Sequence, residues 1–463
     1  MRMSMTSMRQ PAVDPKIAAE LREKRKRIIT QSLAKRHRKE KIFRLLGLLA
    51  VVTGLFFVAV LFGSILYKGL PSFWQTSMTV PVYFDPKMID VGAKPAQRAG
   101  ESPAKYQERY VDWQTKMSMV DWDSLIVKGM IAKDPSLAGQ EDNLRSIYAS
   151  AEAFRIRDMV FKDTNLIGKK VELKFLAEAN VDVWLAGKID RSLPDDQQQL
   201  SPEVRKLVDQ LAKKNMLERT FNVKIFTNGD SRSSPATSGL AGAFMGSLFM
   251  MLIVIFVAIP IGVASAIYLE EFAQKNILTD IIEVNINNLA AVPSIVFGLL
   301  GAAIFVGWMH LPLSAPMVGG LVLSLMTLPT IIITTRAALK AVPPSIRQAA
   351  QGLGASNIQT VLHHVLPLAL PGILTGAIIG VAQALGETAP LLLIGMSAFV
   401  ASVPATPLDQ STALPVQIFL WQGNELRNFF EGRTEAAIIV LLVMMIGLNG
   451  LAIWLRKKFE VRW

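Results

Sequence analysis

The sequence predicts an all-α polytopic membrane protein with six transmembrane helices, interrupted by an α+β extracytoplasmic insert domain. Its 463 residues are 51% hydrophobic and 19% charged, whereas about 25% of the residues in a soluble protein are charged. Several apolar runs reach the roughly 20 residues that a helix needs to cross a bilayer. One long polar interval, residues 71–238, separates the first of these runs from the others.

The N-terminal tail, residues 1–44, is strongly basic. It contains 14 Lys and Arg residues against 4 Asp and Glu residues, and supplies most of the net charge of +12. Basic residues beside a first span usually hold that end of the chain in the cytoplasm, and we interpret the tail in this way; binding of RNA or anionic lipid is the alternative. The first span, residues 45–67, is too long for the apolar region of a signal peptide, so we expect a retained anchor.

The polar interval predicts an extracytoplasmic α+β domain, residues 68–237. Residues 201–216 predict a helix, with Ser201 as its N-cap and Pro202 at its first position. The chain has no cysteine, which excludes disulfides, iron–sulfur clusters and thiolate zinc sites. Patterns typical of strands occur at residues 79–84, 169–189 and 218–226.

A five-helix membrane core, residues 238–458, follows the insert. The segment 227–239, rich in Ser, Gly and Asn, predicts a flexible connection into this core. Six crossings in total return residues 459–463 to the cytoplasm. The five further apolar runs lie at residues 240–269, 286–309, 315–335, 368–396 and 436–455.

Charged residues between the spans agree with this orientation. Arg336, Lys340 and Arg347 follow the fourth span and fall on the cytoplasmic side, where basic residues are enriched. Arg427 and Arg433 precede the last span and fall outside, but four acidic residues accompany them. We therefore expect both termini in the cytoplasm.

Residue groups that carry out covalent chemistry or bind metal are not evident in the sequence. The Gly-Lys pairs at 168–169 and 187–188 are not followed by Ser or Thr, so neither forms a phosphate-binding loop. His363 and His364 point about 100° apart on a helix, which argues against a shared metal. We expect a chain that is not itself an enzyme and holds no cofactor.

A polar hairpin, residues 345–367, stands between the fourth and fifth spans. Pro343 and Pro344 predict the start of a short helix, and Gly354 predicts its end as a left-handed cap. A second helix is expected from Ser356 to Pro367, with an apolar face formed by Ile358, Val361, Leu362 and Val365. Such a pair joined to rigid spans acts as a lever if another protein grips the first helix. An ordinary interfacial loop is the alternative, and the absence of Lys and Arg in 355–366 argues against DNA binding.

These residues resemble the EAA loop in the membrane subunits of ABC importers. The matching positions are Gln348, Ala349, Ala350, Gly354, Leu366 and Pro367, with Gln348 in place of the glutamate. "LAAVPSIVFG" before the hairpin and "LPGILTG", "ALGETAPLL" and "TPLDQSTALPVQIF" after it resemble the A-type permease of the phosphate ABC importer. The resemblance covers about residues 237–458, and a subset of that family carries an insert like residues 71–236.

The resemblance implies a type I ABC importer permease fold in the bacterial inner membrane. It implies that the hairpin sits in a cleft of an ATPase subunit and transmits its movement, and that ATP and Mg²⁺ are bound by the ATPase rather than by this chain. The implied partners are a second homologous permease, two ATPase subunits, an extracytoplasmic phosphate-binding protein and membrane lipid, with no nucleic acid.

Three residues of the fifth span are candidates for the translocation path: Gln383, Glu387 and Thr388. Glu387 is expected within an apolar helix, where a charged side chain costs about 2.5–3.5 kcal/mol on insertion scales. We therefore expect it to face the bundle interior, where it either serves the path or pairs with a neighbouring span. Thr388 can donate a hydrogen bond to an oxyanion. The family that this chain resembles often has Arg at the position of Gln383.

Three other functions remain as alternatives. A permease for a different oxyanion is compatible with the same motifs. An ion-coupled transporter or channel would be expected to show internal repeats and more charge inside its spans. A sensor or scaffold is the third alternative, suggested by the insert.

Overall fold

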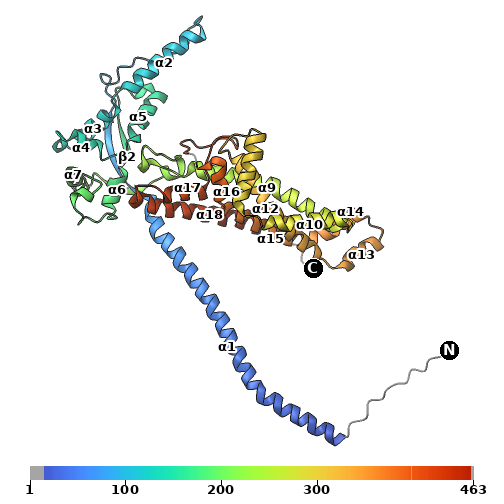
Figure 1. The fold of residues 1–463 in the computed structure, drawn as a ribbon. Helices are drawn as coiled ribbons and strands as arrows, with labels where there is room; N and C mark the ends of the chain where they lie inside the picture. The colour runs from blue at the N-terminus through green and yellow to red at the C-terminus, as the bar shows by residue number, and fades with distance from the viewer. Residues whose placement is uncertain (1–14, 398, 460–463) are drawn as a thin grey trace. The chain divides into compact units, whose positions relative to one another are not determined.

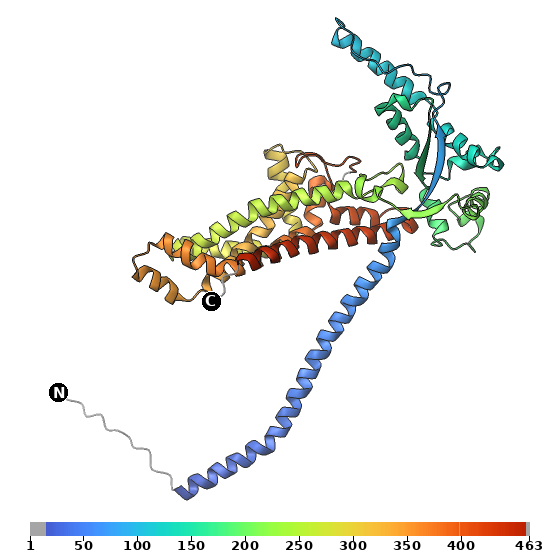
Figure 2. The same cartoon turned by 180° about the vertical axis from the view of Figure 1, so that it is seen from behind.

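The computed structural model describes residues 15–397 and 399–459. Contacts divide the chain into two units, Met1–Ser64 and Ile65–Trp463. The first unit contains most of one long helix, α1 (Pro15–Gly69), whose last turn belongs to the second unit. The large apolar side chains in residues 45–62 are exposed, as expected for a helix surrounded by lipid. Figures 1 and 2 show this helix in blue.

The insert contains a three-stranded antiparallel sheet of order β2-β1-β3. Its central strand buries Val80 and Val82. Helix α3 lies close to this strand, because a Cβ on Gly129 would come 2.7 Å from the carbonyl oxygen of Pro81. The strands are β1 (Trp74–Tyr83), β2 (Lys170–Leu176) and β3 (Glu218–Phe221), and the helices are α2 (Pro103–Met119), α3 (Trp122–Lys133), α4 (Glu141–Arg145), α5 (Ala151–Lys162), α6 (Ala179–Leu185), α7 (Pro202–Lys213) and α8 (Lys224–Thr227).

The local prediction around Ser201 is confirmed, but two predicted strands are too long. Ser201 caps α7, where its side chain accepts a hydrogen bond from the N–H of Val204. The expected strand 169–189 is wrong beyond β2, because residues 179–185 form α6, and 218–226 changes from β3 to α8. Apolar and polar residues alternate over residues 179–183, which is a strand pattern, but five of the seven residues of α6 are buried, the polar Asp182 among them.

The membrane core is an all-helical bundle. Helix α12 packs against both α9 and α15, and small residues permit close approach: a Cβ on Gly320 would lie 2.6 Å from Ile253 of α9. The helices are α9 (Ala241–Ile267), α10 (Ile277–Ala290), α11 (Ser294–Gly301), α12 (Pro316–Lys340), α13 (Pro344–Gly352), α14 (Asn357–Thr360), α15 (Leu366–Gly386), α16 (Ala389–Leu391), α17 (Leu414–Gln422) and α18 (Arg427–Phe459).

Within the described residues, five helices are long and apolar enough to span a membrane, and a sixth span results if a bent pair is counted as one. That pair is α10 and the helix from Ser294 to Trp308, which are bent by 103°. The third span, expected as one helix over 286–309, is therefore broken. The break immediately precedes α11 at Pro293, which cannot donate the backbone hydrogen bond that would continue α10.

The fifth span also differs from the prediction at both ends. Helix α14 continues through a π-helical turn, Val361–Val365, into α15, so Pro367 does not end the second hairpin helix. Pro367 lies in the first turn of α15, beside the π-helical turn that replaces the regular hydrogen-bond pattern. Helix α15 ends at Gly386, and Glu387 has an extended backbone. The expectation that Glu387 lies within a helix is therefore wrong.

Candidate functional site

The hairpin between α12 and α15 is fixed by local backbone signals. Helix α13 ends in a Schellman motif: the N–H of Gly354 donates to the carbonyl of Gln351 at 2.9 Å, and that of Ala355 to the carbonyl of Ala350 at 3.1 Å. Gly354 has a φ of +89°, which confirms the predicted left-handed cap. Ser356 then begins α14 with a capping box completed by Gln359.

The apolar face predicted for the second hairpin helix does not form one surface. Val361 and Val365 are buried, and Val365 belongs to a small core with Leu339 of α12. Ile358 and Leu362 are exposed. The expectation of a single face is wrong, because the helix winds between the bundle on one side and free surface on the other.

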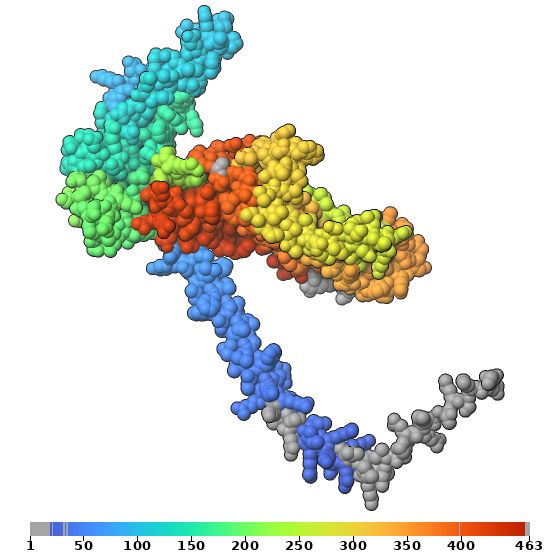
Figure 3. Space-filling view, in the orientation of Figure 1, coloured from blue at the N-terminus to red at the C-terminus, as the bar shows by residue number. Residues whose placement is uncertain are grey.

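The six residues of the predicted coupling motif divide in the same way. Gln348, Ala349 and Gly354 are exposed, whereas Ala350 is buried and Leu366 and Pro367 are half-buried. The most exposed large apolar side chain of the turn is Leu353, at 91%, which the sequence analysis did not single out. The hairpin lies at the end of the bundle opposite the insert (Figures 1 and 3).

The exposed part of the hairpin extends beyond the thickness of a bilayer. The continuous helix Asn357–Gly386 has 30 residues and is therefore about 45 Å long, whereas the hydrocarbon core is about 30 Å thick. The helix is therefore long enough for its first turns, including Ile358 and Leu362, to lie outside the hydrocarbon core. Exposed apolar side chains outside the lipid are typical of a protein-binding surface.

An ion-pair network, missed in the sequence analysis, holds α13 against the end of α9. Arg347 donates to both carboxylate oxygens of Glu271, at 2.6 and 3.2 Å, and to the carbonyls of Leu339 and Val342 at 3.0 and 2.8 Å. The exposed fractions of the Arg347 and Glu271 side chains are 23% and 10%. The hydrogen bond that Arg347 donates to Glu271 is the main cause that raises the pKa of Arg347, although burial opposes it.

A second part of the network surrounds Arg336. Its guanidinium pairs with Glu270 at 3.2 Å and with Glu283 of α10, and Lys340 lies 3.6 Å from Glu270. The network therefore joins α9, α10, α12 and α13. The available signal was the acidic pair Glu270-Glu271 directly after an apolar span, whereas the sequence analysis used the basic residues for orientation alone.

The three candidate path residues lie at the C-terminal end of α15, Gln383 within it and Glu387 and Thr388 just beyond it. Gln383 is exposed, and Glu387 and Thr388 are half-buried. Among the described residues, the Glu387 carboxylate has no hydrogen-bond donor or ion-pair partner. Helix α11 packs closely against the segment after the break at Glu387. A Cβ on Gly298 of α11 would lie 2.7 Å from the Cα of Pro390.

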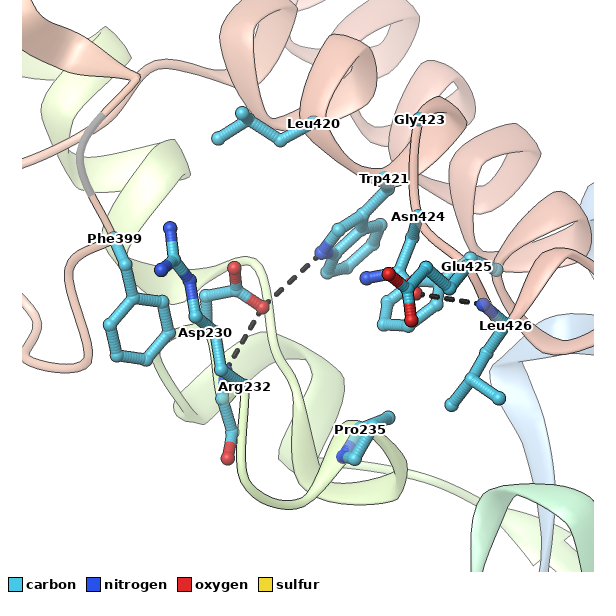
Figure 4. Close-up of a pocket in the computed structure, with 12 residues that line it drawn as sticks. Asp230, Arg232, Pro235, Phe399, Leu420, Trp421, Gly423, Asn424, Glu425 and Leu426 are labelled. Atoms are coloured by element: carbon cyan, nitrogen blue, oxygen red, sulfur yellow. Dashed lines mark hydrogen bonds between the residues drawn. The ribbon is translucent and has the colours of Figure 1, made fainter.

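At the end of the bundle nearer the insert, the segment 227–239 is packed, which contradicts the expected flexible connection. Asp230 accepts hydrogen bonds from Gln417 and Trp421 of α17, at 3.1 and 3.2 Å. The guanidinium of Arg232 lies 5.1 Å from the ring centroid of Phe399. A pocket of about 410 Å³, shown in Figure 4, is bordered by Asp230, Arg232, Phe399 and Trp421.

Two family matches cover most of the chain. Residues 258–463 match the family described as the binding-protein-dependent transport system inner membrane component. Residues 30–195 match a domain of unknown function, DUF3333. The second match includes much of the insert and α1.

Similar proteins include permeases of bacterial transporters. The probable ABC transporter permease protein YqgI of Bacillus subtilis is 33% identical over 170 residues, 36% of this chain and 56% of that protein. The phosphate transport system permease protein PstA of Yersinia pestis is 32% identical over 248 residues, 51% of this chain and 80% of that protein. A solved structure of the MetNI methionine ABC transporter matches with a TM-score of 0.37 and 18% identity, over 48% of this chain and 96% of that one.

Proposed function

Because this chain belongs to the family of binding-protein-dependent transport system inner membrane components, and within it to the permeases of the PstA type, we propose that it forms half of the translocation path of an ATP-driven phosphate importer. The observation that carries the proposal is the match to 80% of a phosphate transport permease at 32% identity. The chain is a multi-pass transport subunit of the inner membrane. A permease for another oxyanion is the second candidate, because Gln383 stands where the family often has Arg.

We propose that the chain works with a second homologous permease, two ATPase subunits that bind ATP and Mg²⁺, and an extracytoplasmic phosphate-binding protein. The chain itself catalyses no covalent step. Gln348, Ala349, Leu353 and Gly354 form the exposed surface for the ATPase. Shape rather than charge dominates this contact, since Gln348 cannot form an ion pair.

The helix geometry supports a mechanical coupling from this surface to the candidate path. Helix α14 continues through the π-helical turn into α15 as far as Gly386, so a displacement of the hairpin is passed along one continuous helix. This helix ends before Glu387, where the backbone is extended. Movement of the ATPase would therefore change the position of Glu387 and Thr388.

Replacing Gly354 by valine tests the coupling assignment. A β-branched residue at a φ of +89° costs about 1–2 kcal/mol and should break the Schellman turn. We expect the complex to assemble while phosphate uptake and transport-dependent ATP hydrolysis fall together. Gly352→Val is the control, because Gly352 is the last residue of α13, two positions earlier, and does not have a positive φ. Unchanged uptake and hydrolysis in Gly354→Val would contradict the coupling role.

Replacing Glu387 by glutamine tests the path assignment. The substitution retains shape and hydrogen-bonding capacity but removes the charge of a carboxylate that has no partner among the described residues. We expect phosphate uptake per assembled complex to fall about tenfold, equivalent to roughly 1.4 kcal/mol, with assembly unchanged. A normal rate per complex, accompanied by a lower melting temperature, would instead identify a structural carboxylate.

We propose that the tail 1–44, the hairpin 340–367 and residues 459–463 are cytoplasmic and that the insert 68–237 is extracytoplasmic. Single cysteines in this cysteine-free chain test the orientation. Lys213→Cys, on the exposed end of α7, should react with a membrane-impermeant maleimide in intact spheroplasts. Lys457→Cys should react only after permeabilisation, and the opposite pattern would invert the topology.

A further inference from the structure

A second pocket, of about 460 Å³, lies where the insert meets the ends of two spans. It is bordered by the last turn of α1, by the first turns of α18 and by the insert. The side chains that matter are Tyr67, Lys68, Lys188, Arg219 and Glu431, with Gly432 beside them. All of them belong to the second structural unit.

The pocket contains more positive than negative charge. Lys68 Nζ lies 2.8 Å from Glu431 Oε1, so these two charges neutralise each other. Arg219 donates through Nη2 to the carbonyls of Pro71 and Trp74, at 3.1 and 3.0 Å. These neutral acceptors position the guanidinium, and no carboxylate of the described residues forms an ion pair with it.

Lys188 is a second cation without an ion-pair partner. Across the described part of the chain, its ammonium has no hydrogen-bond acceptor and no carboxylate within ion-pair distance. Partial desolvation lowers the pKa of Lys188, whereas the more distant charge of Asp182 opposes this effect and that of Arg219 adds to it. A bound anion would favour the charged ammonium by direct attraction.

Gly432 keeps the space beside this ammonium free. A Cβ at that position would collide with Ser72 and would lie 2.8 Å from Lys188 Nζ. Glycine thus allows α18, the turn after α1 and the Lys188 side chain to meet at one point. A side chain at position 432 would therefore both fill part of the pocket and displace the Lys188 ammonium.

The position of the pocket along the chain places it at the depth of lipid headgroups. Lys68 directly follows the apolar run 45–67, and Glu431 and Gly432 lie just before the apolar run 436–455. Tyr67 is 83% exposed, as is typical of an aromatic side chain at the membrane–water interface. Phosphate groups are the main anions in this layer.

We propose that this pocket binds a phosphate group between Lys188 and Arg219, supplied either by the headgroup of an anionic phospholipid or by free inorganic phosphate. Arginine presents a planar pair of donors that matches phosphate oxygens, and lysine adds a point charge. The Lys68–Glu431 pair closes one side of the pocket. The site is separate from Gln383, Glu387 and Thr388, and none of its tests involves transport.

The experiment uses the full chain in its assembled complex, without the binding protein. One arm measures retention of added phosphatidylglycerol by native mass spectrometry, and the other measures binding of labelled inorganic phosphate by equilibrium dialysis in neutral detergent. We expect Lys188→Gln to weaken binding about tenfold in at least one arm, because a charge-assisted hydrogen bond is lost. Lys188→Arg should retain binding, and Lys213→Gln, an exposed lysine elsewhere in the insert, should equal the parent.

The two arms distinguish the source of the phosphate group. Weaker retention of phosphatidylglycerol alone identifies a lipid site, weaker binding of inorganic phosphate alone identifies a free-anion site, and weakening in both shows that either source is accepted. Because the Lys188 ammonium bonds to no described residue, its removal should leave the fold intact. Equal binding by parent and Lys188→Gln in both arms, or no saturable binding by the parent, would overturn the proposal.

Discussion

Replacing Arg347 by methionine should uncouple the hairpin from the bundle and reduce transport-dependent ATP hydrolysis at least about tenfold, the effect of roughly 1.4 kcal/mol. The substitution keeps the apolar stem but leaves Glu271, which is 10% exposed, without its cation. It also removes the Arg347 donor from the carbonyls of Val342 and Leu339, of which Leu339 keeps a hydrogen bond from the N–H of Val342 at 3.2 Å. A carboxylate buried to this extent is costly when unpaired, so α13 should detach from the end of α9.

A double-mutant cycle separates the interaction between Arg347 and Glu271 from the effect of each residue alone. Glu271→Gln removes the charge but retains an acceptor, so we expect a smaller loss than in Arg347→Met. The double variant Arg347→Met with Glu271→Gln should be less impaired than the sum of the two, by about 1–3 kcal/mol. ATP hydrolysis and phosphate uptake by the reconstituted complex give the readout.

A matched control for this cycle is Lys457→Met. Lys457 is an exposed cation near the end of α18, so its replacement should leave ATP hydrolysis and phosphate uptake unchanged. Arg347→Lys is informative as well, because lysine retains the charge but cannot contact Glu271 and both carbonyls in the same fork geometry. Additive effects in the double variant would show that Arg347 and Glu271 act independently and would contradict the proposed connection.

The parts of the site that follow from neighbouring residues were predictable from sequence. Gly354 ends α13 and Ser356 begins α14 because a left-handed glycine and a capping box are determined within a few residues. The approximate positions of the spans were also predictable, because each follows from the length of a continuous run of apolar residues. The breaks before α11 and at Glu387 were not predicted, because the apolar composition continues across both of them.

Contacts between distant residues could not be deduced from the pattern. Arg347 and Glu271 are 76 positions apart, and both appeared in the sequence as ordinary charges beside spans. Arg433 was counted as a charge in an outer loop, although it is only 2% exposed. The sequence shows that a charged residue beside an apolar span needs a partner. Only the fold shows which residue that partner is.

Arg433 connects the insert to the membrane core. Its Nη1 donates to the carbonyl of Ser238 at 2.7 Å, and its Nη2 donates to Gln75 Oε1 at 2.5 Å and to the carbonyl of Ala236 at 3.2 Å. Gln75 belongs to β1 of the insert, whereas Ala236 lies in the segment that leads into α9. One buried guanidinium therefore holds strand β1, this connecting segment and α18 together.

Replacing Arg433 by methionine should release the insert from the core. The guanidinium lies 4.8 Å from the ring centroid of Phe429, a contact that the methionine side chain can partly replace by packing. The Ser238 carbonyl would lose its Arg433 donor, at a cost of about 1–3 kcal/mol. Gln75 Oε1 would keep the hydrogen bond from Asn222, and the Ala236 carbonyl the one from Gln75. We therefore expect a lower melting temperature of the complex in detergent and faster proteolysis within residues 227–239.

The matched control lies on the same helix. Arg427→Met removes an exposed arginine at the start of α18 and should change neither melting nor cleavage. Arg433→Lys should be intermediate, because one ammonium retains the charge but cannot reach all three oxygens from a single position. If Arg433→Met melts and is cleaved like the parent, the insert is held by its apolar contacts alone. Uptake per assembled complex, measured alongside, would then show whether the attachment of the insert affects transport.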